Sequence, residues 1–168
     1  GTGIQSAALA AGGHTSPTGT TATESWNGSS WTSVTSLNTA RTYVQTGGTY
    51  TSALTAGGLS PPATTLGVVE SWNGSSWTEV ADVATPAGQR TVFGQDNNNI
   101  VAVGNGLTEL WNGSAWTETT DLSTARGNTG TANSGPVGSN IVFGGSPSPT
   151  LTEEWTGAGP VTRTFTDS

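Results

Sequence analysis

The sequence predicts an all-β protein built from tandem copies of one antiparallel unit. Segments 25–31 and 71–77 are identical, 110–116 is a close third copy and 154–157 a more distant fourth. The residues between the copies are rich in threonine, valine and glycine and poor in good helix formers, which favours short strands joined by turns. Self-similarity at a period of about 40 residues is typical of a repeat architecture.

Length and composition fit a single domain spanning 1–168. The chain has no cysteine, a formal charge of −7, and four basic residues against eleven carboxylates. Without cysteine there is no disulfide framework and no thiolate metal site. Without a basic surface to neutralise phosphates we expect no nucleic-acid partner. No apolar stretch approaches the length of a bilayer span, so we expect no membrane partner.

Tryptophan supplies the expected core. Leucine, isoleucine, valine and phenylalanine are scarce enough for disorder to be considered. Against this stand seven tryptophans, which together provide roughly 25–45 kcal/mol of gross burial free energy at ~25 cal/mol per Å². Because they recur at fixed places in the repeat, we expect the chain to fold around them. The tryptophans expected to be structural are Trp26, Trp31, Trp72, Trp77, Trp111, Trp116 and Trp155.

Each repeat divides into four strands, called a, b, c and d in chain order. Strand a follows an arginine, strand b ends at a glycine pair, strand c ends at the leading tryptophan and strand d begins near the second. Four antiparallel strands in a repeat of this size describe the blade of a β-propeller. A glutamate stands two residues before each leading tryptophan, and its recurrence predicts a structural role. These glutamates are Glu24, Glu70, Glu109 and Glu153.

The turn between strands c and d is predicted to contain two residues. Asn-Gly, as at 73–74, is the preferred centre of a type I′ hairpin. A four-residue loop would instead place Trp72 opposite Trp77. It would also place Glu70 opposite Glu79, and directly opposed like charges destabilise a strand pair. In either register both tryptophans share one face of the blade and can pack on its neighbour.

The glycine pair, the acidic residue with its aromatic neighbour and the second tryptophan resemble the Kelch repeat of β-propellers. The wording Glu-Ser-Trp-Asn-Gly-Ser-Ser-Trp-Thr-Glu-Val at 70–80, with Leu-Asn-Thr-Ala-Arg at 37–41, is similar to tandem repeats in virion proteins of aquatic bacteriophages. The resemblance implies a Kelch-like β-propeller in the tail or another structural part of a virion, outside a cell. The sequence departs from the Kelch pattern where tryptophan replaces the usual tyrosine on strand c.

Counting strands leaves one missing. The blades are expected at about 1–37, 41–80, 88–119 and 125–166, and the first supplies only strands b, c and d. We therefore expect about four Kelch-like four-stranded blades, the first lacking one strand. Three arrangements stay open: a four-bladed ring with one incomplete blade, part of a larger propeller chain, or a ring closed by association of copies.

Candidate binding residues lie in the loops between strands b and c. These loops vary in length and carry prolines, whereas the Asn-Gly-Ser turns are constant. Because strand direction alternates, the variable loops share one rim with the d–a connections, and loops on a fixed scaffold commonly carry binding residues. The loop candidates are His14, Ser16, Leu59, Ser60, Asn105, Ser146 and Ser148. Arg41 and Arg126, which precede strands a, are expected to pair with a neighbouring blade's carboxylate or with loop carbonyls, with a bound anion as the alternative.

We expect no catalytic residue, metal or cofactor. A single histidine, His14, cannot build the usual zinc site, and no nucleophile elbow accompanies it. Residues 96–99 begin like a calcium loop, but Ile100 occupies a ligand position, so we expect the turn between strands a and b. The expected function is a non-enzymatic recognition or structural module that binds a host surface glycan or a neighbouring virion protein. A polysaccharide-degrading enzyme and a pure self-assembly module are the alternatives.

Overall fold

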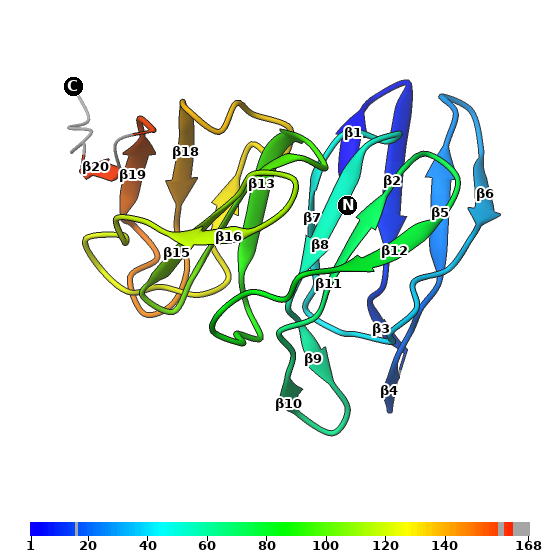
Figure 1. Ribbon diagram of the computed structural model, residues 1–168, viewed down its shortest axis with the longest axis horizontal. Coiled ribbons are helices and arrows are strands. Elements are labelled where there is room, and N and C mark those ends of the chain that lie inside the picture. Colours follow the sequence, from blue (N-terminus) through cyan, green and yellow to red (C-terminus); the bar gives the residue numbers. More distant parts are fainter. Residues whose placement is uncertain (16, 158–159, 163–168) are drawn as a thin grey trace.

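The computed structural model describes residues 1–15 and 17–157 and the backbone of 160–162. Over these residues the chain is all β, with four antiparallel sheets of four strands each (Figure 1). In the same part of the chain, no helix has the length and hydropathy needed to cross a membrane. The prediction of an all-β fold made of four-stranded antiparallel blades is confirmed.

Each sheet is one repeat, and its strands lie in the order a, b, c, d. Blade 1 contains β1 (Thr2–Ile4), β2 (Ala7–Ala11), β5 (Thr23–Trp26) and β6 (Trp31–Val34). Blade 2 contains β7 (Gln45–Gly48), β8 (Ala53–Ala56), β11 (Val69–Trp72) and β12 (Trp77–Val80). Blade 3 contains β13 (Thr91–Asp96), β14 (Asn99–Gly104), β15 (Leu107–Trp111) and β16 (Trp116–Glu118). Blade 4 contains β17 (Gly130–Thr131), β18 (Asn140–Phe143), β19 (Thr152–Trp155) and β20 (Pro160–Thr162).

Two small hairpins extend the b–c loops of the first two blades. The loop of blade 1 folds into β3 (His14–Thr15) and β4 (Thr18–Gly19), and that of blade 2 into β9 (Leu59–Ser60) and β10 (Thr64–Thr65). In Figure 1 both hairpins project from the same edge of the molecule. The variable loops therefore gather on one rim of the scaffold.

Blade 1 is complete, so the prediction that it lacks a strand is wrong. β1 pairs with β2 from Thr2 opposite Leu9 to Ile4 opposite Ala7. Strand a of the other blades follows an arginine, whereas residues 1–40 contain none. A three-residue strand next to a tight turn carries too little pattern of its own to be recognised.

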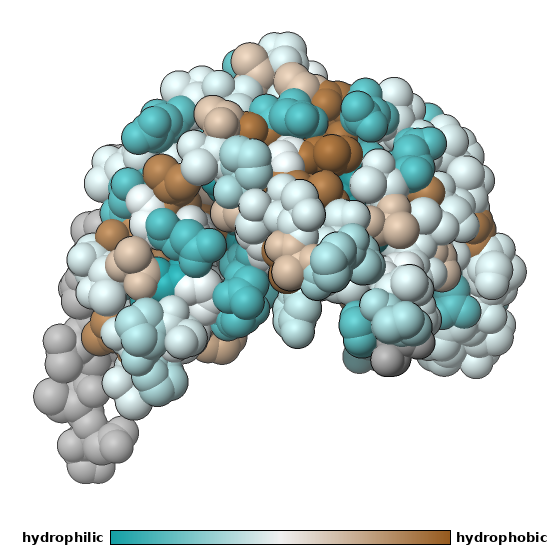
Figure 2. Space-filling model, turned by 90° about the horizontal axis from the view of Figure 1, so that it is seen from below, coloured by the Kyte–Doolittle hydropathy of each residue, from teal (hydrophilic) through white to brown (hydrophobic). Residues whose placement is uncertain are grey.

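The blades form an open arc. Neighbouring blades meet through strand a, with β1 against β7, β7 against β13 and β13 against β17. Blades 1 and 4 lie at opposite ends of the molecule in Figure 1, and the space-filling view in Figure 2 shows an arch that is hollow between its arms. Each end of the arc therefore presents one face of a blade to solvent.

Three apolar clusters, one between each pair of neighbouring blades, form the core. In each cluster, strand b of one blade packs against tryptophan of the next. The clusters join Leu9 and Ala11 to Trp72 and Trp77, Leu54 and Ala56 to Trp111, and Val101 and Val103 to Trp155. Each blade thus has an aliphatic face, formed by alternate residues of strand b and directed to the following blade. Its opposite side is a tryptophan face, formed by the tryptophans of strands c and d and directed to the preceding blade.

The c–d turn has four residues, so the prediction of a two-residue turn is wrong. Trp72 lies directly opposite Trp77 and Glu70 opposite Glu79, and blades 1 and 3 have the same register. The two indole rings of blade 2 are in contact, with centroids 5.3 Å apart. Aromatic pairs of this kind contribute about 0.5–1.5 kcal/mol beyond their burial. The opposed glutamates are tolerated because Arg41 neutralises the charge of Glu70.

The asparagine of the repeat organises this loop through its side chain. Oδ1 of Asn73 accepts hydrogen bonds from the backbone amides of Ser75 and Ser76, each at 3.0 Å. The following residue, Gly74, has φ +95°, a conformation that glycine adopts without steric cost. Asn-Gly here builds an Asx-type loop rather than the centre of a type I′ turn.

One loop of blade 4 lies against the inner strands of the other blades. The backbone carbonyl of Asn133 accepts hydrogen bonds from the amides of Gly48 and Gly94, at 3.2 and 3.1 Å. Its side-chain amide donates to the carbonyl of Gly1 at 2.8 Å. The loop between β17 and β18 therefore joins blades 1, 2 and 3.

Candidate functional site

A buried ion pair joins the start of strand a to strand c in blades 2, 3 and 4. In each pair an arginine Nη2 lies within 2.6 Å of a glutamate oxygen, and the side chains are almost fully removed from solvent. The pairs are Arg41 with Glu70, Arg90 with Glu109, and Arg126 with Glu153.

The chain segment ahead of each arginine binds the same carboxylate. The backbone amides of Asn38 and Thr39 donate to the two oxygens of Glu70, at 2.7 and 3.2 Å. Nη1 of Arg41 donates to the carbonyls of Gly57 and Val68. Burial lowers the pKa of Arg41, and the charge of Glu70 opposes that shift. This network clamps the d–a connection to the blade and leaves the carboxylate no role at the surface.

Arg41 and Arg126 pair with a carboxylate and with loop carbonyls as expected, but the carboxylate belongs to the same blade rather than to a neighbour. Their alternative role as binding residues is corrected. Both side chains are buried, at 0 % and 1 % exposure, so a ligand on the rim does not reach them. Arg90 occupies the same place in blade 3 and was missed, because Ala-Gly-Gln-Arg at 87–90 does not repeat the Thr-Ala-Arg wording. The available signal was an arginine upstream of the repeat glutamate in blades 2, 3 and 4. Glu24 of blade 1 is exposed and forms no ion pair with any arginine among the described residues.

The b–c loops and the d–a connections are hydrogen-bonded to each other. Isolated bridges join Thr20 to Arg41 and Thr42 to Leu59, with the Thr42 and Leu59 amides and carbonyls bonded at 2.8 Å in both directions. A similar bridge joins Gly127 to Ser146 in blade 4. These bonds hold the variable loops at defined positions, which a binding surface requires.

A pocket of about 170 Å³ opens on this rim between blades 1 and 2. It brings together three residues that the sequence analysis singled out, His14 from the first b–c loop and Leu59 and Ser60 from the second. The described residues that line it are His14, Pro17, Thr42, Tyr43, Leu59, Ser60, Pro61 and Pro62. The pocket thus combines flat apolar rings with a few hydrogen-bonding groups.

Tyr43 is the pocket residue that sequence reasoning missed. Its side chain is 60 % exposed, and its backbone has φ +52°. A bulky side chain in the left-handed region costs on the order of 1 kcal/mol, and such residues concentrate at functional sites. The sequence does not reveal that a tyrosine has a positive φ. The available signal was an aromatic residue two positions after Arg41.

The other predicted rim residues lie away from this pocket. Asn105 is exposed in the b–c turn of blade 3, with φ +55°. Ser146 and Ser148 lie in the b–c loop of blade 4, where the amide of Ser146 donates to Gly127. Ser16 lies outside the described residues. The structure therefore separates the rim candidates into a group on blades 1 and 2 and a group on blades 3 and 4.

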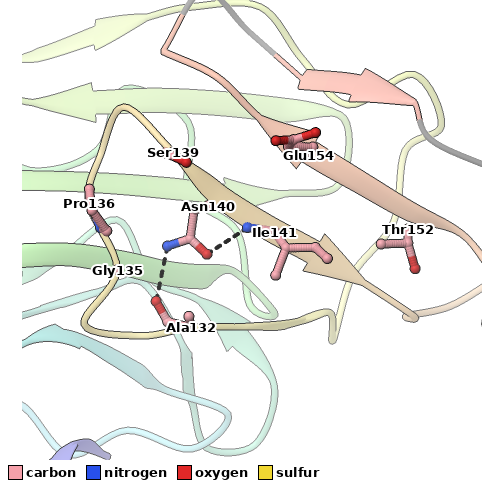
Figure 3. Close-up of a pocket in the computed structure, with 8 residues that line it drawn as sticks. All are labelled: Ala132, Gly135, Pro136, Ser139, Asn140, Ile141, Thr152 and Glu154. Carbon is pink, nitrogen blue, oxygen red and sulfur yellow. Dashed lines mark hydrogen bonds between the residues drawn. The ribbon is translucent and has the colours of Figure 1, made fainter.

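A wider hollow of about 610 Å³ lies on the aliphatic face of blade 4 (Figure 3). Ile141 from β18 and Glu154 from β19 are cross-strand neighbours in its wall. Asn140 uses both ends of its amide internally, donating to the Ala132 carbonyl at 3.0 Å and accepting from the Ile141 amide at 2.7 Å. The hollow therefore combines apolar surface with the side chain of Glu154.

No cluster of metal-ligand type was found in residues 1–15 and 17–157, where no three His, Asp or Glu side chains converge. Residues 96–99 form the a–b turn of blade 3, as predicted. Oδ1 of Asp96 accepts the backbone amide of Asn98 at 2.8 Å. The carboxylate is thus part of the turn itself.

No family model matches the chain, and no curated protein matches its sequence. In fold it is similar to the solved structure of YjhT, a Kelch-type propeller, with a TM-score of 0.68 at 13 % sequence identity. The match covers 87 % of this chain and 53 % of the YjhT chain. The chain therefore has a propeller-like fold and spans about half the length of that protein.

Proposed function

We propose that the chain is a non-enzymatic recognition module that takes its ligand in the rim pocket between blades 1 and 2. The observation that carries the proposal is the meeting of His14, Tyr43 and Ser60, from three separate segments, around one hollow. Rigid scaffolds commonly carry their binding residues on loops held at one edge. The left-handed backbone at Tyr43 adds support, since the fold holds an exposed aromatic ring there at an energetic cost.

The chemistry of the pocket favours one unit of a neutral glycan. Tyr43, Pro61 and Pro62 offer flat apolar surfaces, while His14 and Ser60 offer hydrogen-bonding groups. A few polar groups in an apolar lining are typical of small-molecule sites. The volume of 170 Å³ is below the roughly 300–1,000 Å³ of sites for drug-sized ligands, which favours a ligand as small as one sugar unit. Among the described residues no arginine lines the pocket, and the chain has no lysine, which disfavours phosphate. A loop side chain of a neighbouring virion protein is the second candidate ligand, because proline and tyrosine also suit protein contacts.

We further propose that the module belongs to a phage particle and meets the host surface outside the cell. The support is the resemblance of segments 70–80 and 37–41 to repeats of virion proteins. The absence of catalysis is part of the proposal. The repeat glutamates Glu70, Glu109 and Glu153 are buried against arginines in three separate blades, an arrangement unsuited to paired acid–base work.

The test is a glycan array followed by titration calorimetry with the glycan that binds. We expect Tyr43→Ala to weaken binding by about 30-fold, as for a central aromatic contact. The matched control is Tyr50→Ala, because Tyr50 is also exposed but lies in the a–b turn, beside the Asn-Gly-Ser turn and away from the rim. Replacing 59–69 should abolish binding, and replacing 146–152 should preserve it. Unchanged binding in Tyr43→Ala would refute the site, and release of reducing sugar from host polysaccharide would refute the non-enzymatic assignment.

A further inference from the structure

The two ends of the arc carry the two halves of the interface that joins its blades. At one end, Trp26 and Trp31 form the tryptophan face of blade 1, paired in the register of Trp72 and Trp77. At the other end, Ile141 and Phe143 occupy alternate positions of β18 and form the aliphatic face of blade 4. Their equivalents in β8 are Leu54 and Ala56, by the pairing of each strand b with strand c.

Equivalent residues are buried inside the arc and exposed at its ends. Trp31 is 49 % exposed, whereas Trp77 is 6 % exposed. Phe143 is 47 % exposed, whereas Ala56 is 1 % exposed. Large apolar side chains exposed together on one face are a feature of interaction sites on proteins in water.

Both end faces are hollowed, and on blade 4 the polar residues Thr152 and Glu154 lie beside the apolar ones. The hollow of about 610 Å³ on blade 4 includes Ile141 in its wall (Figure 3). A second hollow of about 290 Å³ lies on the tryptophan face of blade 1, where Ile4, Ala8 and Trp31 line it. Inside the arc, the corresponding space on blade 2 is filled by Trp111 of blade 3. The end of blade 4 therefore lacks the tryptophans of a following blade, and the end of blade 1 lacks the aliphatic residues of a preceding one.

We propose that a second copy of this chain supplies both missing halves. The tryptophan face of blade 1 packs on the aliphatic face of blade 4 in the other copy, and the reciprocal contact closes a ring of two arcs. The interface continues a packing arrangement that the chain already builds three times. Head-to-tail contacts between identical chains form rings when the rotation closes. The matched 87 % of one arc covers 53 % of the YjhT chain, so one arc is a little more than half of a propeller of that kind. The eight blades of two arcs lie within the range of about four to eight known for propellers.

Mass photometry and sedimentation equilibrium of the purified chain test this arrangement. We expect a species of twice the 16.8 kDa chain mass. Trp31→Glu and Phe143→Glu should each raise the dimer dissociation constant by about 30-fold or more, because each places a charge at the centre of a contact. Both side chains are about half exposed within the arc, so each variant should keep its fold, as checked by circular dichroism. Tyr50→Glu, at an exposed aromatic residue away from both end faces, is the matched control and should remain dimeric.

A mixing experiment distinguishes head-to-tail pairing from same-face pairing. When the Trp31→Glu and Phe143→Glu proteins are mixed, a mixed dimer has both substitutions in one of its two contacts and none in the other. Dimers should therefore reappear in the mixture, although neither variant forms them alone. Same-face pairing predicts instead that one variant remains dimeric by itself. A wild-type chain that stays monomeric, an intact Phe143→Glu dimer, or assemblies that grow beyond two copies would each overturn the proposal. Ligand binding at the rim pocket is measured separately, so failure of the ring leaves the proposed function standing.

Discussion

Nη2 of Arg41 lies 2.5 Å from Oε1 of Glu70, and neither side chain reaches solvent. The same geometry recurs with Arg90 in blade 3 and Arg126 in blade 4. Each pair ties the connection entering a blade to strand c of that blade. A charge buried in this way depends on its partner, because removal of one member leaves the other uncompensated in a medium of low dielectric constant.

Glu70→Gln should lower the free energy of unfolding by about 3–5 kcal/mol, the usual consequence of breaking a buried ion pair from one side. Urea unfolding followed by tryptophan fluorescence measures the change. Glu24→Gln is the matched control, since Glu24 holds the same position in blade 1 but is exposed, and it should change the value by less than about 0.5 kcal/mol. Equal effects of the two substitutions would show that the ion pair is not what stabilises the blade.

Asn73→Ala should destabilise the protein by about 1–2 kcal/mol, because two loop amides lose the oxygen that accepts their hydrogen bonds. Asn73→Asp retains an acceptor in the same place and should restore most of the loss. Thermal unfolding by calorimetry compares the two. If Asp were no better than Ala, the side-chain oxygen would not be the organising group of the loop.

Thr23→Val tests the contact between blades 1 and 2. Thr23 is buried, and its Oγ1 accepts a hydrogen bond from the indole N–H of Trp77 at 3.1 Å. Valine preserves the shape but leaves that buried donor unsatisfied, which costs about 1–3 kcal/mol. Thr32→Val, on the exposed strand β6, should be neutral in the same chemical denaturation experiment. A neutral Thr23→Val would argue that water reaches the indole nitrogen.

Gly47→Ala should destabilise the protein by about 1–3 kcal/mol through overpacking. A Cβ at Gly47 would lie 3.0 Å from the Cα of Phe93, in the close approach between β7 and β13. Gly138→Ala should be tolerated, because nothing lies within 4 Å of its Cβ position. Melting temperatures of the two variants decide the matter, and a stable Gly47→Ala protein would mean that the inner strands can separate slightly.

Tyr43→Asn should raise stability while it reduces ligand affinity. Asparagine tolerates the left-handed conformation better than tyrosine does, so the expected gain is about 0.5–1 kcal/mol. Tyr50→Asn should bring no gain, since Tyr50 has no positive φ. Unfolding curves and ligand titration of the same samples measure both quantities. Loss of stability in Tyr43→Asn would show that the tyrosine ring supports the fold rather than a ligand.

The repeat predicted the blades because its signal is periodic: a strand pattern that recurs four times is read from all copies together. The b–c loops were also located correctly, since variation among copies marks them, and His14, Leu59 and Ser60 do meet in one pocket. Tyr43 escaped notice because nothing in a single sequence reports a backbone angle.

The length of the c–d turn and the role of Arg90 depend on contacts between distant segments, which local sequence preferences do not report. Repulsion between Glu70 and the opposite Glu79 does not decide the register, because Arg41 from the preceding connection neutralises one of the two charges. The contact between facing indole rings then favours the longer loop. Arg90 was overlooked because the residues before it differ from the Thr-Ala-Arg sequence that precedes strand a in blades 2 and 4.

Linear arrays of repeats commonly unfold in steps, because each repeat contacts only its neighbours. The carbonyl of Asn133 gives this chain a different character, because one group of blade 4 accepts hydrogen bonds from amides of both blade 2 and blade 3. Fraying of the last blade therefore withdraws support from the first three at once. We expect the whole arc to unfold as one cooperative body, and its final segment to complete the structure only after every earlier segment has been synthesised.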